Sequence, residues 1–201
     1  MNTTDFDLAE LATYLHLTPQ QVERLVNRGK LPGRRVGGQW RFPRAEIHHW
    51  MEERMGVMDD EELAQLEDSL ARNSSAHSLA SLLQPETIAV PLVARTRDSA
   101  IRAMVELLAN QGLVWDPDKM GQAIRQREEL QSTALDCGVA LLHPRRPQTA
   151  ILGDSCVAMG VTGGGIPFGG SKHLTDIFFL IASMDDKTHL RSLARISRLL
   201  T

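Results

Sequence analysis

The sequence predicts a mixed α/β (α+β) chain in two parts: a small N-terminal module of short helices with one hairpin, and a larger C-terminal mixed β-sheet covered by helices. Three observations support this class. The N-terminal segments have helical periodicity, and the local net charge changes from positive to negative before residue 80. After residue 80, helical and strand-like segments alternate. Segments that alternate in this way pack as a sheet between helices. We expect domains at residues 1–55 and 81–201, joined by an acidic helical linker at 56–80.

The composition restricts the protein class. A chain of 201 residues with 42% hydrophobic residues can form one large domain or two small ones. No apolar run approaches the ~18 residues of a membrane span, so no membrane insertion is expected. The acidic, polar N-terminus resembles neither a signal nor a transit peptide, and Cys137 and Cys156 are too few for a disulfide framework. We therefore expect a cytoplasmic protein.

Charge separates the segments. Residues 19–44 contain seven Lys or Arg residues against one acid, whereas residues 56–80 contain six acids against one Arg. Residues 81–201 are nearly balanced. Such asymmetry usually indicates different partners for different segments.

The first two helices have clear start signals. Asp7 can cap a helix whose apolar residues follow a 3.6-residue period. Thr18 followed by Pro19 is a cap with proline at the first helical position, and Gly29 ends this second helix. With a turn at residues 16–18, the pair forms a helix-turn-helix.

A hairpin and a third helix complete the module. Residues 34–42 alternate around the Gly37-Gly38 turn, which predicts a β-hairpin. A helix over residues 43–54 would bury Ile47, Trp50 and Met51. The outward Arg, Gln and Asn side chains of the second helix could pair with base edges in a major groove, and the hairpin arginines suit phosphates or a minor groove. A solvated basic face is the alternative.

Residues 7–54 closely resemble the excisionase and MerR-like winged helix-turn-helix family. The matching features are a Leu-Ala-x-x-Leu opening, a Thr-Pro-x-x-Val helix, Gly-x-Leu-Pro, an Arg-x-Gly-Gly-x-Trp-Arg-Phe wing and Ile-x-x-Trp. Some relatives with this fold are only adaptors. The resemblance implies DNA binding, with Gln20, Gln21, Arg24 and Asn27 as groove readers, and Arg35, Arg41 and Arg44 as backbone or wing contacts.

The connector is predicted to be one acidic helix over residues 60–72, with Leu63, Leu66 and Leu70 along one side. It could be a simple tether, or it could form a homodimer through its apolar stripe.

The C-terminal part alternates in type. Strands are predicted at 87–93, 138–142, 149–152, 156–161 and 175–183, and Pro91 indicates an edge position or a strand end. Helices are predicted from the Asp98-Ser99 cap to Gly112, from Asp116-Pro117 to Arg127, and over residues 186–200.

His143 ends a buried strand and precedes Pro144, with Arg127 sixteen residues upstream. Most histidines in such positions are simply hydrogen-bonded. A metal site would need His143, His189 and His173, but no HxH or HExxH spacing is present, so no metal or cofactor is expected. Cys137 is too far along an extended chain to pair with His143. The triplet Gly163-Gly164-Gly165 lacks the Lys-Ser/Thr of a P-loop and is interpreted as a hairpin turn.

Phosphorylation of the imidazole is the fourth interpretation of His143. A neutral imidazole is a competent nucleophile toward a phosphoryl group, whose oxygens need cations and aligned donors. Arg127 offers a bidentate guanidinium, a second imidazole could donate a hydrogen bond, and Ser132 and Thr133 are further donors.

Residues from about 81 onward resemble the enzyme IIA domain of the bacterial phosphoenolpyruvate-dependent sugar phosphotransferase system (PTS), fructose/mannitol type, including its nitrogen-regulatory branch. The resemblance lies in Arg127-Glu128 with Ser132-Thr133, in residues 138–143, in residues 176–182 and in His189-Leu190. It implies that His143 is phosphorylated, that His189 supports it and that Arg127 binds the phosphate. It also implies that the donor is the phosphocarrier HPr or its nitrogen-branch relative.

We therefore expect a bacterial regulator that senses phosphotransferase status and alters DNA occupancy. Leu142 replaces the proline usual in the family, and no enzyme IIB or membrane segment is attached, which favours regulation over sugar transport. One alternative is a phosphocarrier that relays to an enzyme IIB, with an adaptor module. Another is a DNA-binding protein with an inactive IIA-like domain.

Overall fold

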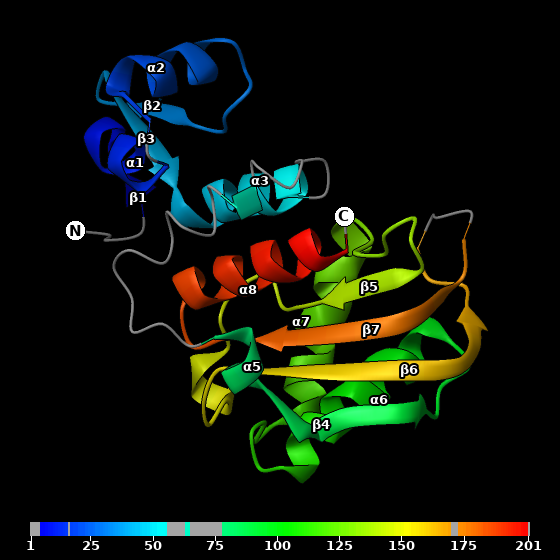
Figure 1. Cartoon of the computed structure of the whole chain (residues 1–201). Coiled ribbons are helices and arrows are strands. Elements are labelled where there is room, and N and C mark those ends of the chain that lie inside the picture. Colours follow the sequence, from blue (N-terminus) through cyan, green and yellow to red (C-terminus); the bar gives the residue numbers. More distant parts are fainter. Residues whose placement is uncertain (1–4, 16, 56–62, 65–77, 170–172, 201) are drawn as a thin grey trace. The chain divides into compact units, whose positions relative to one another are not determined.

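The computed structural model of the chain describes residues 5–15, 17–55, 63–64, 78–169 and 173–200. It divides into two compact units, Met1–Met58 and Asp59–Thr201 (Figure 1). Both units mix helices with strands, which confirms the α/β class. Except for Leu63 and Ala64, the predicted connector helix lies outside the described residues. Within the described segments, no helix is both long and apolar enough to cross a membrane.

The first unit is a helix-turn-helix with a small antiparallel sheet, in the strand order β1-β3-β2. A short first strand, which was not predicted, pairs Phe6 with Phe42. The elements are β1 (Asp5–Phe6), α1 (Leu8–Tyr14), α2 (Pro19–Asn27), β2 (Arg34–Val36), β3 (Gln39–Pro43) and α3 (Arg44–Met55).

Local chemistry explains these elements. Asp7 and Thr18 each form a capping box, with Glu10 and Gln21 respectively, so orphan N–H groups at both helix starts are satisfied. The turn between β2 and β3 has φ values of 59° and 82° at Gly37 and Gly38, a conformation in which glycine carries no steric penalty.

A few apolar side chains form the core of the first unit. Leu11, Val22, Phe42 and Ile47 are fully buried. Trp50 is only half-buried, because its indole N–H reaches the surface and donates to the carbonyl of Lys30 at 2.7 Å. This bond ties α3 to the loop that follows α2.

The second unit is a four-stranded mixed sheet in the order β4-β6-β7-β5. The outer pairs, β4 with β6 and β5 with β7, are parallel, whereas the central pair is antiparallel. Helices α6 and α7 cover one face in Figure 1, and α8 packs beside β7. The elements are α5 (Leu79–Leu82), β4 (Leu83–Leu92), α6 (Arg97–Asn110), α7 (Pro117–Leu130), β5 (Val139–Leu142), the 3-10 helix η1 (Thr149–Ile151), β6 (Cys156–Ile166), β7 (Thr175–Ala182) and α8 (Asp186–Leu199).

Three local predictions in this unit are wrong. Residues 149–152 are not a strand: the carbonyl of Ile151 accepts from Trp115 N–H at 2.8 Å, so the run pairs with the segment after α6 instead of joining the sheet. Gly163–Gly165 lie inside β6, where the register against β7 shifts, and form no hairpin turn. The cap of α6 is Thr96, whose Oγ1 accepts from Ser99 N–H at 3.2 Å. The edge position expected from Pro91 is confirmed.

Candidate functional site

His143 and His189 meet at one end of the sheet. Strands β5 and β7 run parallel, with Leu142 opposite Leu180, so their carboxyl ends lie at the same edge. His143 follows β5 directly, and His189 lies in the first turns of α8, the helix that follows β7. The two imidazole rings have centroids 5.1 Å apart and are tilted by 55°. Parallel pairing thus joins residues that are forty-six positions apart in the chain.

The start of α8 is held by its cap. Asp185 accepts from the backbone N–H of Thr188 at 2.9 Å and from its hydroxyl at 2.7 Å. The backbone N–H of His189 donates to the carbonyl of Asp185 at 3.1 Å. These bonds fix the turn that carries His189, and the side chain of His189 is buried.

The tautomer of His143 follows from one contact. Nδ1 lies 2.7 Å from the carbonyl oxygen of Leu141. A carbonyl oxygen only accepts, so Nδ1 carries the proton, and in the neutral ring Nε2 has the lone pair. The side chain is 3% exposed. Nε2 is therefore the nucleophilic atom of this residue.

The loop before β5 runs alongside the strand. Leu141 N–H donates to the carbonyl of Thr133 at 3.2 Å, and Leu135 N–H donates to the carbonyl of Val139 at 2.7 Å. Gly138, with φ of 82°, makes the tight reversal between them. Thr133 consequently lies beside Leu141, which is two residues before His143.

Glu128 organises this loop and was not predicted as a site residue. Its buried carboxylate accepts from the backbone N–H of Thr133 at 3.0 Å and from the Thr133 hydroxyl. Arg97 lies 4.0 Å away, and its guanidinium also lies over the ring of Phe168. The sequence feature that could have identified Glu128 is an acidic residue directly after Arg127, at a position that helical periodicity places on the buried face of the helix.

Arg127 lies at the C-terminal end of α7 with 5% of its surface exposed. Its Nη1 donates to the carbonyl of Gln131 at 2.9 Å, one of the helix-end carbonyls without an intrahelical partner. Ser132 Oγ accepts from Ala134 N–H at 3.2 Å. The structure thus brings the two histidines into contact and places Thr133 beside the strand that ends at His143. Arg127 is bonded to the carbonyl at the end of its own helix, and Ser132 is bonded within the loop that follows.

The remaining candidates of this unit differ in exposure. His173 and Cys137 are exposed. Cys156 is buried at the start of β6. Its burial, with a smaller contribution from Asp154, raises the pKa of its thiol from 9.0 to about 12. Cys156 is therefore an unreactive thiol at neutral pH.

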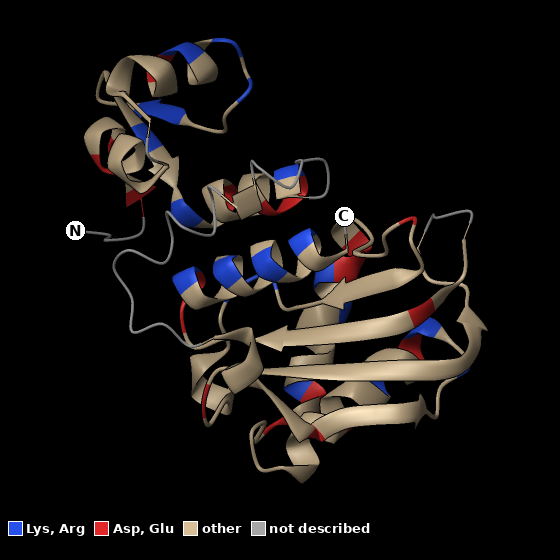
Figure 2. Ribbon diagram, viewed as in Figure 1, with Lys and Arg blue, Asp and Glu red and all other residues tan. Residues whose placement is uncertain are grey.

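The first unit presents its predicted polar side chains to solvent. Gln20, Gln21, Arg24 and Asn27 on α2 are all exposed, although Gln21 Oε1 also accepts from Thr18 N–H at 2.8 Å. Figure 2 shows Lys and Arg on α2, β2 and β3.

Aromatic rings and a neighbouring amide hold the arginines of the hairpin and of α3. Arg35 lies over Trp40 at 4.9 Å, and Arg44 lies over Phe6 at 3.9 Å. Arg41 donates to Gln39 Oε1 at 3.2 Å. These contacts order long side chains without neutralising their charge.

Comparisons with known proteins found a family model for each part of the chain. A model of the family "Phosphoenolpyruvate-dependent sugar phosphotransferase system, EIIA 2" matches residues 81–201, and a helix-turn-helix domain model matches residues 6–55. The PTS system fructose-specific EIIABC component of Bacillus subtilis is 30% identical over 128 residues. That match covers 61% of this chain and only 19% of the relative, so the chain spans about a fifth of its length.

Two solved structures from Escherichia coli are similar to the second unit. A complex of enzyme IIAMTL with phosphorylated enzyme IIBMTL matches with 24% identity and a TM-score of 0.50, covering 57% of this chain and 80% of the other. IIA mannitol matches with 26% identity and a TM-score of 0.46, covering 51% and 72%. The first of these shows the shared fold.

Proposed function

This chain belongs to the family of the phosphoenolpyruvate-dependent sugar phosphotransferase system, EIIA 2, and carries a helix-turn-helix domain ahead of it; from that premise we propose that it is a regulator whose His143 accepts a phosphoryl group. The observation that carries the proposal is the His143–His189 pair, with Nδ1 of His143 bonded to Leu141. The donor is the phosphohistidine of an HPr-like phosphocarrier protein.

The proposed step is an in-line transfer between two imidazoles. The lone pair on Nε2 of His143 attacks phosphorus, and the N–P bond of the donor breaks, returning its electron pair to the donor ring. No proton leaves His143, because Nδ1 keeps its hydrogen. Phosphorylation places positive charge on the His143 ring, and the Leu141 carbonyl at 2.7 Å stabilises it.

The neighbouring groups then have distinct roles. The imidazole of His189, centred 5.1 Å from that of His143, donates to a phosphoryl oxygen and limits the motion of the acceptor ring. The guanidinium of Arg127 supplies charge and N–H donors to the equatorial oxygens. Ser132 supplies a hydroxyl donor from the adjacent loop. The hydroxyl hydrogen of Thr133 is donated to Glu128, so Thr133 supports the loop instead of donating to the phosphoryl group. Glu128 positions Thr133 without reaching the phosphoryl group.

The helix-turn-helix domain supports a DNA-binding role. The exposed Gln20, Gln21, Arg24 and Asn27 are residue types that read base edges in the major groove. The amide of Gln21 is shared with the cap of α2, so Arg24 and Asn27 contribute more of the sequence preference. Arg35, Arg41 and Arg44 contact the phosphate backbone, and the resemblance to excisionase-type wings agrees with this assignment.

Phosphorylation places a phosphoryl group of about 1.5 to 2 negative charges beside the now cationic His143 ring and changes DNA affinity. Couplings of this kind are typically ~1–3 kcal/mol, or about fivefold to 150-fold in affinity. To test this, the protein is treated with phosphoenolpyruvate, enzyme I and HPr, and binding to fragments selected from a genomic library is compared before and after. Equal affinity in the two states would overturn regulation through His143.

A phosphocarrier role is the second candidate. It is favoured by the likeness to the Escherichia coli protein solved in complex with a phosphorylated enzyme IIB. In that case the phosphoryl group passes from His143 to an enzyme IIB and the first unit binds no DNA. Relay to an enzyme IIB without any DNA shift supports this candidate over the regulator.

A further inference from the structure

The turn that follows β6 packs directly against the loop that carries Ser132. At Gly169 in this turn, a Cβ atom would overlap both Oγ and Cβ of Ser132, and it would lie 3.7 Å from Cβ of Ala134. Rotation of the short serine side chain moves Oγ but leaves Cβ where the backbone holds it. Any side chain at position 169 therefore requires one of the two backbone segments to move.

The turn itself is anchored in the core. Phe168 is buried, and its ring packs edge-to-face against Phe178 of β7 with centroids 5.4 Å apart. The guanidinium of Arg97 lies 5.8 Å from the centre of the same ring. Gly169 has φ of 72°, a conformation that glycine adopts without steric cost. Because these contacts hold the turn, a side chain added at position 169 displaces Ser132.

The direction of the Ser132 hydroxyl depends on the backbone of its loop. Its Oγ accepts from the backbone N–H of Ala134 at 3.2 Å, and its hydroxyl hydrogen can be donated to a phosphoryl oxygen. The loop pairs antiparallel with β5 at Ala134 and Ala140, so the chain direction carries Ser132 toward the end of the strand that His143 follows. A shift of the Ser132 backbone therefore changes where the hydroxyl points.

We propose that Gly169 is a positioning residue for phosphoryl transfer and acts through Ser132. Its missing side chain leaves the space in which Ser132 holds its hydroxyl toward the group that is transferred to His143. This inference rests on the proposed function and adds the turn after β6 to the parts that the reaction needs. Because glycine offers no side-chain donor, we expect position 169 to affect the maximal rate of transfer (kcat) and not the KM for the donor protein.

Gly169→Ala tests the proposal in the full-length protein, with phosphorylated HPr as the donor and with kcat and KM measured separately. Misplacement of a reacting group by about 1 Å can cost roughly 100-fold in rate, so we expect kcat to fall by about tenfold to 100-fold at an unchanged KM.

Gly112→Ala is the matched control for backbone strain. Gly112 has φ of 70°, and in the described part of the chain no atom beyond its chain neighbours lies within 4 Å of the Cβ position. This variant has the same strain as Gly169→Ala without the overlap, so it should melt a few degrees lower and transfer at the wild-type rate. Equal kcat values in the two variants would overturn the inference.

Ser132→Gly removes the overlap from the other side. It deletes both atoms that an alanine at position 169 would overlap, so Gly169→Ala should lower kcat no further in this background. It should also restore the part of the melting temperature that Gly169→Ala loses beyond Gly112→Ala. Losses in kcat that multiply in the double variant would overturn the inference. If Gly169→Ala alone does not fold, the comparison of the double variant with Ser132→Gly decides the question.

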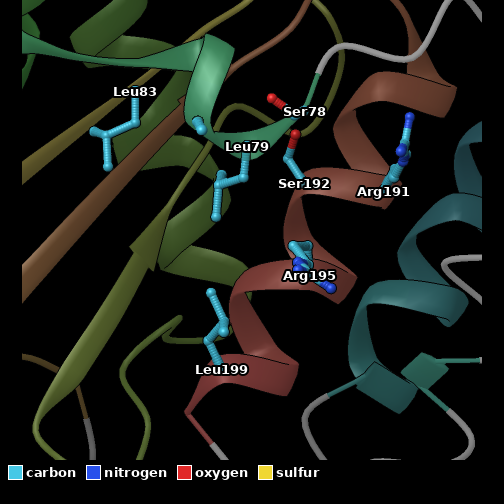
Figure 3. Close-up of a pocket in the computed structure, with 8 residues that line it drawn as sticks. Ser78, Leu79, Leu83, Arg191, Ser192, Arg195 and Leu199 are labelled. Atoms are coloured by element: carbon cyan, nitrogen blue, oxygen red, sulfur yellow. The ribbon is translucent and has the colours of Figure 1, made fainter.

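A variant elsewhere in the second unit controls for general loss of stability. Leu79 on α5 lines a pocket of about 470 Å³ whose other wall is α8 (Figure 3). Leu79→Ala removes apolar contacts there, so it should lower the melting temperature and leave kcat at the wild-type value. A fall in kcat as large as that of Gly169→Ala would assign the effect to lost stability and overturn the inference.

Failure of this inference and failure of the proposed function give different results. A wild-type protein that takes no label from phosphorylated HPr would overturn the proposed function, and the inference with it. A labelled wild type together with a normal kcat in Gly169→Ala would overturn the inference alone.

Discussion

The carboxylate of Glu128 accepts the backbone N–H of Thr133 at 3.0 Å and the hydroxyl of the same residue. Both side chains are buried, and the Thr133 carbonyl in turn accepts from Leu141, two residues before His143. The end of α7 is thereby fixed to the strand that presents His143. A buried carboxylate with both of these donors is expected to matter for stability as well as for position.

Glu128→Gln tests this anchor. The substitution keeps the shape but removes the charge, and we expect the free energy of unfolding to fall by about 1.5–3 kcal/mol, the usual range for hydrogen bonds to charged groups. Urea denaturation measures it. The adjacent Glu129 is exposed, so Glu129→Gln should change stability by less than about 0.5 kcal/mol. Equal effects of the two substitutions would contradict the role given to Glu128.

His189→Ala should slow phosphoryl transfer to His143 without unfolding the protein. Loss of one positioned donor to a developing charge typically costs about 10²–10³-fold in rate. The initial rate of label transfer from phosphorylated HPr measures the effect. His189→Gln, which retains an N–H donor, should recover part of the rate, and His173→Ala, at an exposed position, should be unchanged. A wild-type rate in His189→Ala would remove His189 from the site.

Cys156 gives a pH dependence of stability. Its pKa is raised by burial to about 12 in the folded protein, so between pH 9 and 12 the unfolded chain loses this proton while the folded chain keeps it. Stability must therefore fall with rising pH, by up to about 1.4 kcal/mol per pH unit from this group. Cys156→Ala should lower stability at pH 7 but show a shallower decline above pH 9. Parallel declines in the two proteins would contradict the raised pKa.

Arg24→Gln tests the proposed DNA contact. Arg24 is exposed on α2, and losing one base or phosphate contact should weaken binding by about 1–3 kcal/mol, roughly fivefold to 150-fold. Titrations at several salt concentrations separate the cases: a phosphate contact also reduces the salt slope by about one, whereas a base contact relaxes the sequence preference. Arg102→Gln in the other unit serves as the control. Unchanged affinity and salt slope in Arg24→Gln would place Arg24 outside the interface.

Helix starts could be predicted from the sequence because their signals are local. Thr18 before Pro19 and Asp116 before Pro117 each supply a side-chain acceptor and a residue without an N–H, and both cap a helix in the structure. The α6 cap was misplaced because Thr96 and Asp98 are both acceptable capping residues. Only the extended backbone of Thr96 and its bond to Ser99 distinguish them.

Long-range pairing could not be predicted from periodicity. The apolar run at 149–152 has the composition of a strand, yet the bond between Ile151 and Trp115, and that between the adjacent Gly153 and Leu113, hold it outside the sheet. The His143–His189 contact likewise depends on β5 pairing with β7, a fact of sheet order that no local pattern contains. The family resemblance implies the pairing of His143 with His189, but it does not predict the bond between Glu128 and Thr133.

The most direct test of the central claim is the position of the phosphate on the protein after treatment with phosphoenolpyruvate, enzyme I and HPr. Nuclear magnetic resonance of ¹⁵N-histidine-labelled protein identifies both the residue and the ring nitrogen. We expect an acid-labile phosphate on Nε2 of His143, present in His173→Ala and absent from His143→Ala. A protein that takes up no phosphate, or carries it on Nδ1 of His143 or on another residue, would contradict the account.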